Sequence, residues 1–224
     1  MGTMVTFTRP DGQTVPGYLA QPASAGGPAG IVMFQEWWGL DQHMKETADR
    51  FAGEGFRVLV PDLYRGKVAD NRETAGHLSS GLNFGDAVTQ DAAGAARYLR
   101  EHGCAHVGVT GFCMGGALAM LAAMNDNAFD SAVVWYGYPP AEAGDPGKIR
   151  IPLQGHWSKR DEFFKIEGVD EIERKLKAGN VPYEFHRYEA GHAFLNPGGI
   201  GNYDRDDAEA AWGRTVDFFK KTLK

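Results

Sequence analysis

The segment Val107-Gly-Val-Thr-Gly-Phe-Cys-Met-Gly-Gly-Ala-Leu-Ala-Met120 determines the fold that we expect for this chain. Its first four residues are small or apolar and predict a short buried strand over 107–110. The residues that follow Gly115 are good helix formers. Between these elements, Gly111-Phe-Cys-Met-Gly115 places a nucleophile between two small residues, which is the pattern of a nucleophile elbow, with cysteine where serine is more usual.

The two flanking glycines have a physical reason in such an elbow. A strand that turns abruptly into a helix strains the central residue and leaves no room for Cβ atoms at the flanking positions, where Gly111 and Gly115 stand. The side chain of Cys113 would then project from the turn at a helix N-terminus, whose dipole lowers the pKa of a thiol. The pattern alone leaves a second interpretation open, in which Cys113 is a small apolar residue buried in a glycine-rich turn.

The composition is typical of one globular domain covering residues 1–224. A net charge of −6 without a basic cluster argues against nucleic acid or an anionic membrane surface as a partner. No apolar run approaches the roughly 20 residues of a membrane span, and no signal peptide is visible at the N-terminus. The two cysteines, Cys104 and Cys113, predict no structural disulfide and favour a cytoplasmic location. We expect a monomer or a weak homodimer.

Strands and helices alternate along the chain after an opening hairpin. The expected strands are 4–8, 15–20, 30–35, 56–60, 107–110, 131–136, 149–154 and 183–188, and the expected helices are 42–54, 71–80, 86–101, 116–123, 168–178 and 204–223. This order predicts an α/β-hydrolase fold, with a mostly parallel central sheet and helices on both faces. Reactive side chains should then lie just after strands, at the carboxyl edge of the sheet.

A thiol nucleophile needs a base, and the base needs an orienting carboxylate. In the elbow fold the chain order is nucleophile, acid, histidine. Asp161 follows the strand expected at 149–154, and His192 follows the strand expected at 183–188, so both fit this order. His156 is the rival base, because it also follows a strand, but it precedes the acid position.

Other carboxylates and a metal site are alternatives to this assignment. Glu162, Asp145 and Asp170 compete with Asp161 as the acid. The seven histidines show neither an HExxH motif nor a Cys/His pair at ligand spacing, so we expect no metal and no cofactor.

Acyl transfer also needs donors for the developing oxyanion. The backbone N–H of Met114, at the start of the elbow helix, is one candidate, and the N–H of Trp37, after the strand at 30–35, is the second. Glu36 is an unusual carboxylate at the end of an apolar strand and beside two tryptophans. It is either a functional residue or the partner of a nearby arginine or lysine.

These motifs together resemble the dienelactone hydrolase family of α/β-hydrolases over almost the whole chain. The matching segments are Gln35-Glu-Trp-Trp-Gly-Leu40, Val60-Pro-Asp-Leu-Tyr64, Gly111-Phe-Cys-Met-Gly-Gly116, Asp161 and Gly191-His-Ala-Phe194. The resemblance implies a catalytic triad of Cys113, His192 and Asp161. It also implies that Glu36 holds the thiol in a resting arrangement until substrate binds, which would protect a thiolate that oxidants attack readily.

The chain departs from the family at the positions where family members bind an acidic substrate. Members that act on dienelactone hold its carboxylate with two arginines; Arg72 matches the first, whereas Asn196 occupies the position of the second. Charge-assisted bidentate pairs are the strong ones, so one strong contact is missing. Gly76 and Ser79 replace expected aromatic residues. A neutral or differently shaped ester or lactone is therefore expected as substrate.

We expect Arg72, Trp38, Tyr136, Phe194 and Asn196 to contact that substrate, with Trp37 and Tyr138 as further pocket candidates; each aromatic residue fits a plain core position equally well. The predicted reaction is hydrolysis of a small carboxylic ester or lactone through a thioester on Cys113. The alternatives are other reactions of the same groups, as in a thioesterase, a peptidase or a phosphotriesterase, and a ligand-binding protein without efficient turnover.

Overall fold

The structure, a computed structural model, describes residues 1–23, 29–125 and 128–224 and places their strands in a single eight-stranded sheet. The strand order is β1-β2-β4-β3-β5-β6-β7-β8. β1 and β2 form an antiparallel hairpin, β2 also pairs antiparallel with β4, and all remaining neighbours pair parallel. The strands are β1 (Thr3–Thr8), β2 (Thr14–Ala20), β3 (Gly30–Phe34), β4 (Arg57–Pro61), β5 (Val107–Phe112), β6 (Ser131–Trp135), β7 (Leu153–Ser158) and β8 (Tyr183–Tyr188).

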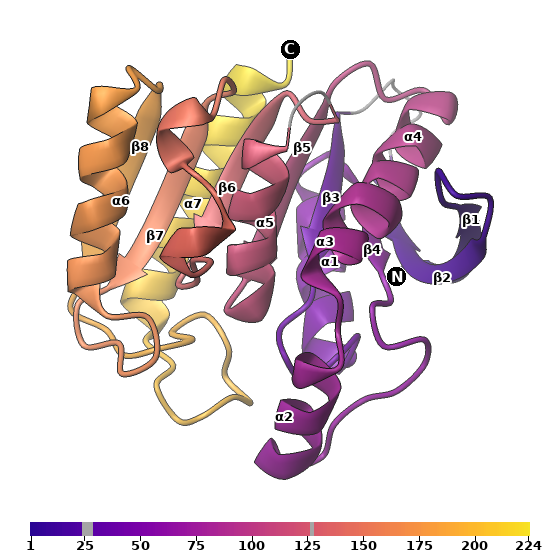
Figure 1. The fold of residues 1–224 in the computed structure, drawn as a ribbon. Coiled ribbons are helices and arrows are strands. Elements are labelled where there is room, and N and C mark those ends of the chain that lie inside the picture. The colour runs from indigo at the N-terminus through magenta and orange to yellow at the C-terminus, as the bar shows by residue number, and fades with distance from the viewer. Residues whose placement is uncertain (24–28, 126–127) are drawn as a thin grey trace.

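Helices cover both faces of this sheet, as Figure 1 shows. The helices are α1 (Gln42–Gly53), α2 (Arg72–Ser80), α3 (Phe84–Asp86), the π-helical η1 (Ala87–Ala92), α4 (Ala93–Glu101), α5 (Met114–Met124), the 3₁₀ turns η2 (Ala141–Ala143) and η3 (Pro146–Lys148), α6 (Ile166–Ala178) and α7 (Arg205–Thr222). α4, α5 and α6 pack on one face, and α1 and α7 pack on the other. The predicted α/β-hydrolase architecture is therefore confirmed.

The alternation of side chains along the parallel strands produces two apolar layers. In β3, Val32 and Phe34 belong to the layer under α4 and α5, whereas Ile31 and Met33 belong to the layer under α1 and α7. All four are fully buried. A strand buried on both faces reads as a continuous apolar run, which is why the sequence predicts these central strands well.

One strand prediction is wrong in its boundaries. The strand expected at 149–154 is β7 at Leu153–Ser158, so His156 lies inside the strand and not after it. Proline has no N–H to donate, and pairing with β6 begins only after Pro152, at Leu153. His156 was expected just after the strand, yet it is a fully buried strand residue.

The helix expected at 86–101 is present but contains a π-helical segment. α3, η1 and α4 follow one another directly, and η1 spans Ala87–Ala92. Asp91 in this segment is buried, with 2% of its surface exposed. A π-helical turn of this kind is rare in proteins, and hydrophobic periodicity does not reveal it.

Candidate active site

The elbow between β5 and α5 has the strained geometry that its glycines predict. Cys113 has φ 56° and ψ −118°, outside the regions that a residue with a side chain ordinarily adopts. A Cβ atom on Gly111 would lie 2.0 Å from the carbonyl oxygen of Gly115, and one on Gly115 would lie 2.5 Å from the carbonyl oxygen of Gln35. Neither position accepts a larger residue, so the elbow depends on both glycines.

Three loops bring the sulfur, the imidazole and the carboxylate together. His192 Nε2 lies 3.1 Å from Cys113 Sγ, and His192 Nδ1 lies 2.7 Å from Asp161 Oδ2. The three residues follow β5, β7 and β8, at the carboxyl edge of the sheet. His192 and Asp161 are buried, with 5% and 7% of their surface exposed.

The acid is held by its own loop. Asp161 Oδ1 accepts hydrogen bonds from the backbone N–H groups of Phe163 and Phe164, each at 2.8 Å. Its second oxygen is therefore free to face the imidazole. The competing carboxylates are occupied elsewhere: Asp145 caps η3, and Asp170 pairs with Arg187 on the surface.

His156, the alternative base, is a hydrogen-bonded residue of the core. Its Nδ1 lies 2.8 Å from the hydroxyl of Tyr188, and its Nε2 lies 2.9 Å from both Gln154 Oε1 and Thr215 Oγ1. Burial lowers its pKa well below the usual range, so this ring stays neutral. Both ring nitrogens are already satisfied among β7, β8 and α7, which explains a histidine inside a strand.

Both expected oxyanion donors act on the thiol. The backbone N–H groups of Met114 and Trp37 lower the pKa of Cys113, against the larger effect of its burial. Donors in this position would meet the oxygen of a carbonyl carbon attacked by the sulfur.

The net pKa of Cys113 differs from the value expected for a cysteine at a helix N-terminus. Burial raises the pKa of the thiol, and the nearby carboxylate of Glu36 raises it further. The helix dipole predicted a lowered pKa, but the loss of water around the sulfur is the larger effect. Cys113 is therefore a neutral thiol at rest.

Glu36 lies near Cys113 and is almost completely buried, with 2% of its surface exposed. Asn196 Nδ2 donates to its Oε2 at 2.6 Å, and the hydroxyl of Tyr136 donates to its Oε1 at 3.5 Å. Burial raises the pKa of Glu36 to about 7, against the effect of the Asn196 hydrogen bond. Its partners are thus an amide and a phenol, not the arginine or lysine of the alternative interpretation.

We expect Glu36→Gln to increase the reactivity of Cys113 above neutral pH. The carboxylate is charged above pH 7 and then disfavours the thiolate, whereas glutamine carries no charge. Alkylation of Cys113 by iodoacetamide at pH 8 should be about tenfold faster in the variant, as a tenfold larger thiolate fraction would give. Below about pH 6 the wild-type carboxyl is protonated, so the two rates should converge.

Peptide mass mapping separates Cys113 from the buried Cys104 in this measurement. Glu46→Gln, on the exposed side of α1, is the matched control and should leave the alkylation rate unchanged. Equal rates for Glu36→Gln and wild type at pH 8 would show that the charge of Glu36 does not act on the sulfur.

A cavity of about 390 Å³ opens on Cys113 and His192. Its walls are largely apolar and include Trp37, Trp38, Phe84, Tyr138, Phe163 and Phe164, and Glu36 is the carboxylate among the described lining residues. Among the described residues that line it there is neither arginine nor lysine. The sequence reasoning missed Phe84, Phe163 and Phe164; the last two stand two and three residues after Asp161, and that position is the signal that could have revealed them.

Four of the five residues expected to contact substrate lie elsewhere, and only Trp38 lines the cavity. Tyr136, Phe194 and Asn196 are buried beneath it, with at most 3% of their surface exposed. Tyr136 and Asn196 contact Glu36, and the ring of Phe194 packs on Tyr136 at 5.3 Å, so these three support the site from below. Their polar atoms and rings are used within the protein, which removes them from the pocket surface.

Arg72 lies in the first turn of α2 and is exposed. It lines a neighbouring polar cavity of about 420 Å³, which shares Phe163 and His192 with the first cavity. The arginine therefore lies outside the cavity that opens on Cys113.

Among the described residues, no helix has both the length and the apolar character needed to cross a membrane. Within the same ranges, no three His, Cys, Asp or Glu side chains gather as a metal site would require.

Comparison with known proteins identifies the family. The sequence model of the dienelactone hydrolase family matches residues 15–223. The chain belongs to the dienelactone hydrolase family. "Protein usf" of Aquifex pyrophilus is 38% identical over 235 residues, and the protein of Aquifex aeolicus named "Putative carboxymethylenebutenolidase" is 35% identical over 236 residues, each with full coverage of both chains.

Solved structures agree on the fold. A dienelactone hydrolase-like promiscuous phosphotriesterase from metagenomic libraries superposes with a TM-score of 0.85 at 24% identity, covering 100% of this chain and 99% of its own. At this identity the likeness concerns the fold. The present chain is thus a member of a hydrolase family, and the dienelactone hydrolase architecture spans its full length.

Proposed function

We propose that this dienelactone hydrolase family member hydrolyses small neutral carboxylic esters or lactones with Cys113 as nucleophile. The observation that carries the proposal is the line of contacts from Cys113 Sγ through His192 to Asp161, at 3.1 and 2.7 Å, at the end of an apolar cavity. Nucleophile, base and orienting acid are recognised by this geometry.

The reaction follows from the positions of these groups. As the sulfur of Cys113 bonds to the substrate carbonyl carbon, the thiol proton passes to His192 Nε2. The backbone N–H groups of Met114 and Trp37 stabilise the oxyanion of the tetrahedral intermediate. When that intermediate collapses, the carbon–oxygen bond breaks and His192 returns the proton to the leaving alcohol, which leaves a thioester on Cys113.

The second half uses the same base. His192 takes a proton from water, the hydroxide oxygen bonds to the thioester carbon, and the carbon–sulfur bond breaks. The proton then returns to the sulfur, and the acid product leaves. Asp161 holds the imidazole in the tautomer that accepts at Nε2 and stabilises its protonated form throughout.

The cavity walls support a neutral substrate. A carboxylate bound in this aromatic chamber would lose its water without gaining a cation, because Arg72 lies outside it and Asn196 is occupied by Glu36. Burial of an unpaired charge costs several kcal/mol. A neutral acyl chain of similar length meets no such penalty.

We expect p-nitrophenyl butyrate to be hydrolysed with a kcat/KM roughly 100-fold above that of mono-p-nitrophenyl succinate. A 100-fold ratio corresponds to about 2.7 kcal/mol, which is within the cost of burying the unpaired carboxylate of the succinate. The two esters share a leaving group and differ in the charge at the far end of the acyl chain. Arg72→Gln is the matched variant and should change neither rate. Equal rates for both esters, or a selective loss for the succinate in Arg72→Gln, would contradict a neutral chamber.

A neutral phosphotriester is the second candidate substrate. The same apolar cavity accepts an uncharged triester, and a neighbour in fold is described as a promiscuous phosphotriesterase. Mass spectrometry of the protein after reaction distinguishes the two, since an acyl group and a phosphoryl group on Cys113 differ in mass. Turnover of the triester without turnover of any carboxylic ester would favour this candidate.

A further inference from the structure

One tyrosine hydroxyl contacts both residues that supply the oxyanion donors. The hydroxyl of Tyr64 donates to the backbone oxygen of Trp37 at 3.1 Å and lies 3.4 Å from Met114 Sδ. Tyr64 itself is 6% exposed. Burial raises the pKa of the Tyr64 hydroxyl, and a negative charge on the Cys113 sulfur would raise it further, so the hydroxyl keeps its proton throughout the neutral range.

The loop that carries Tyr64 is held by a buried carboxylate. Asp62, 3% exposed, accepts from the backbone N–H of Tyr64 at 3.2 Å and from that of Gly66 at 2.6 Å. Arg65 has φ 54° and turns its guanidinium back to donate to the backbone oxygen of Asp62 at 2.6 Å. The turn is therefore closed on itself, and the ring of Tyr64 projects from it toward the elbow.

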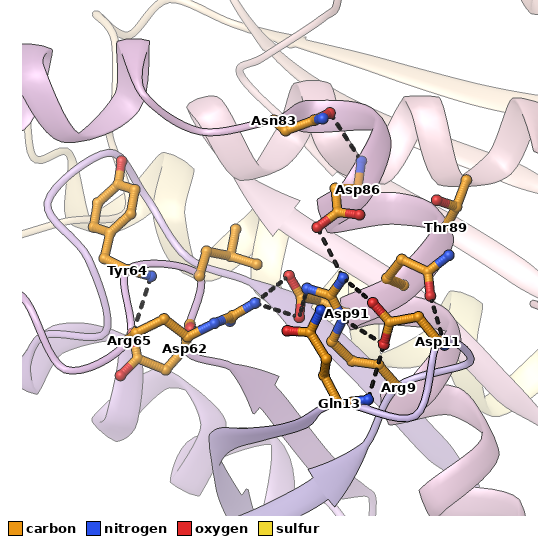
Figure 2. Close-up of polar contacts among 12 residues, drawn as sticks. Arg9, Asp11, Gln13, Asp62, Tyr64, Arg65, Asn83, Asp86, Thr89 and Asp91 are labelled. Atoms are coloured by element: carbon orange, nitrogen blue, oxygen red, sulfur yellow. Dashed lines mark hydrogen bonds and ion pairs between the residues drawn. The ribbon is translucent and has the colours of Figure 1, made fainter.

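An ionic network ties this turn to the rest of the fold, as Figure 2 shows. Arg65 Nη2 lies 2.7 Å from Asp91, in the π-helical segment η1. Asp91 also pairs with Arg9 at 3.5 Å, and Arg9 contacts Asp11 at 2.6 Å. Arg9 and Asp91 are almost completely buried. Breaking a buried ion pair strongly destabilises the fold, so this network holds the turn that carries Tyr64 rigidly.

We propose that Tyr64 is a positioning residue that orients the oxyanion hole. Its hydroxyl bonds to the peptide that follows Trp37 and packs against Met114. It thereby restrains the two residues that carry the donors, without touching the reacting atoms itself. Oxyanion donors act through preorganisation, so their orientation sets how much they stabilise the transition state. The proposal rests on the proposed function, because it assumes that an oxyanion forms at Cys113.

The test removes the hydroxyl and keeps the ring, in Tyr64→Phe. Complete loss of one oxyanion donor costs 10² to 10³ in kcat, and a misaligned donor costs less, so we expect a fall of about 10-fold in kcat for a neutral ester. KM should stay within about twofold, because the ground-state ester does not use the donors fully. Tyr18→Phe is the matched control: Tyr18 is also buried, its hydroxyl bonds to Asp49, and it lies away from the elbow.

The inhibition constant of a trifluoromethyl ketone distinguishes a positioning role of Tyr64 from a purely structural one, which would leave this constant unchanged. The sulfur of Cys113 adds to the carbonyl carbon of the ketone, the thiol proton passes to His192, and the new alkoxide occupies the oxyanion site. Its inhibition constant should rise about 10-fold in Tyr64→Phe, in step with kcat, whereas that of the matching methyl ketone should not change. Arg65→Gln, which separates the turn from Asp91 but keeps the hydroxyl, should shift the fluoroketone constant in the same direction by a smaller factor.

The outcomes separate the two proposals. No fluoroketone adduct on Cys113 in the wild type would contradict the proposed function. An adduct with an unchanged inhibition constant and unchanged kcat in folded Tyr64→Phe would overturn the role of Tyr64 and leave the proposed function intact. If Tyr64→Phe does not fold, Arg65→Gln decides: an unchanged inhibition constant overturns the anchoring of the oxyanion hole through this turn.

Discussion

Cys113→Ala is expected to lower kcat/KM for a neutral ester by a factor on the order of 10⁴ to 10⁶, the range found when a nucleophile is removed from a triad. Without the sulfur, no thioester can form, and His192 has no nucleophile to activate at 3.1 Å. The measurement is steady-state hydrolysis of p-nitrophenyl butyrate, with mass spectrometry to detect the acyl group on the wild-type protein.

The second cysteine provides the control for this experiment. Cys104 is buried outside the site, so Cys104→Ala should retain the rate and the acyl adduct. Hydrolysis that survives in Cys113→Ala at a rate near wild type would assign the nucleophile to another group. An ester bound without turnover in both proteins would instead indicate a ligand-binding member of the dienelactone hydrolase family.

Asp161→Asn is expected to lower kcat by about 10⁴ while the protein stays folded. The asparagine amide is nearly isosteric and can still accept the two backbone hydrogen bonds from Phe163 and Phe164. However, its amide can donate to His192 Nδ1, which favours the tautomer that cannot accept the thiol proton at Nε2.

Glu162→Gln tests the specificity of that effect. Glu162 is adjacent in sequence but exposed, and it lines the polar cavity beside Arg72 and not the chamber of the nucleophile. Its substitution should leave kcat unchanged. Circular dichroism and thermal unfolding of both variants separate a loss of catalysis from a loss of structure. A near-normal rate in Asp161→Asn would move the acid to another residue.

The chain order of the reactive groups was predictable because each follows a strand of a parallel sheet. Gly111 and Gly115 identify the elbow from the sequence alone, since the turn has no room for Cβ atoms at those two positions. The positions of Asp161 and His192 after their strands then follow from topology, as the carboxyl ends of parallel strands meet at one edge.

The environment of the site was less predictable. Tyr136, an aromatic residue, and Asn196, at the position of the family's second arginine, were expected to contact substrate, but both turn inward to Glu36. His156 looked like a loop residue and is a fully buried strand residue. In each case a polar side chain is satisfied by partners far away in the sequence, and local patterns carry no information on such partners.

The sequence by itself determined the α/β order of elements, the elbow around Cys113 and the positions of Asp161 and His192 after their strands, because strand periodicity and glycine sterics are local properties of the chain. Only the tertiary structure decided the pKa of Cys113, the neutral character of the chamber and the contacts of Tyr64. These depend on how much water the packed walls exclude and on which distant groups lie within a few ångströms, and packing sets both.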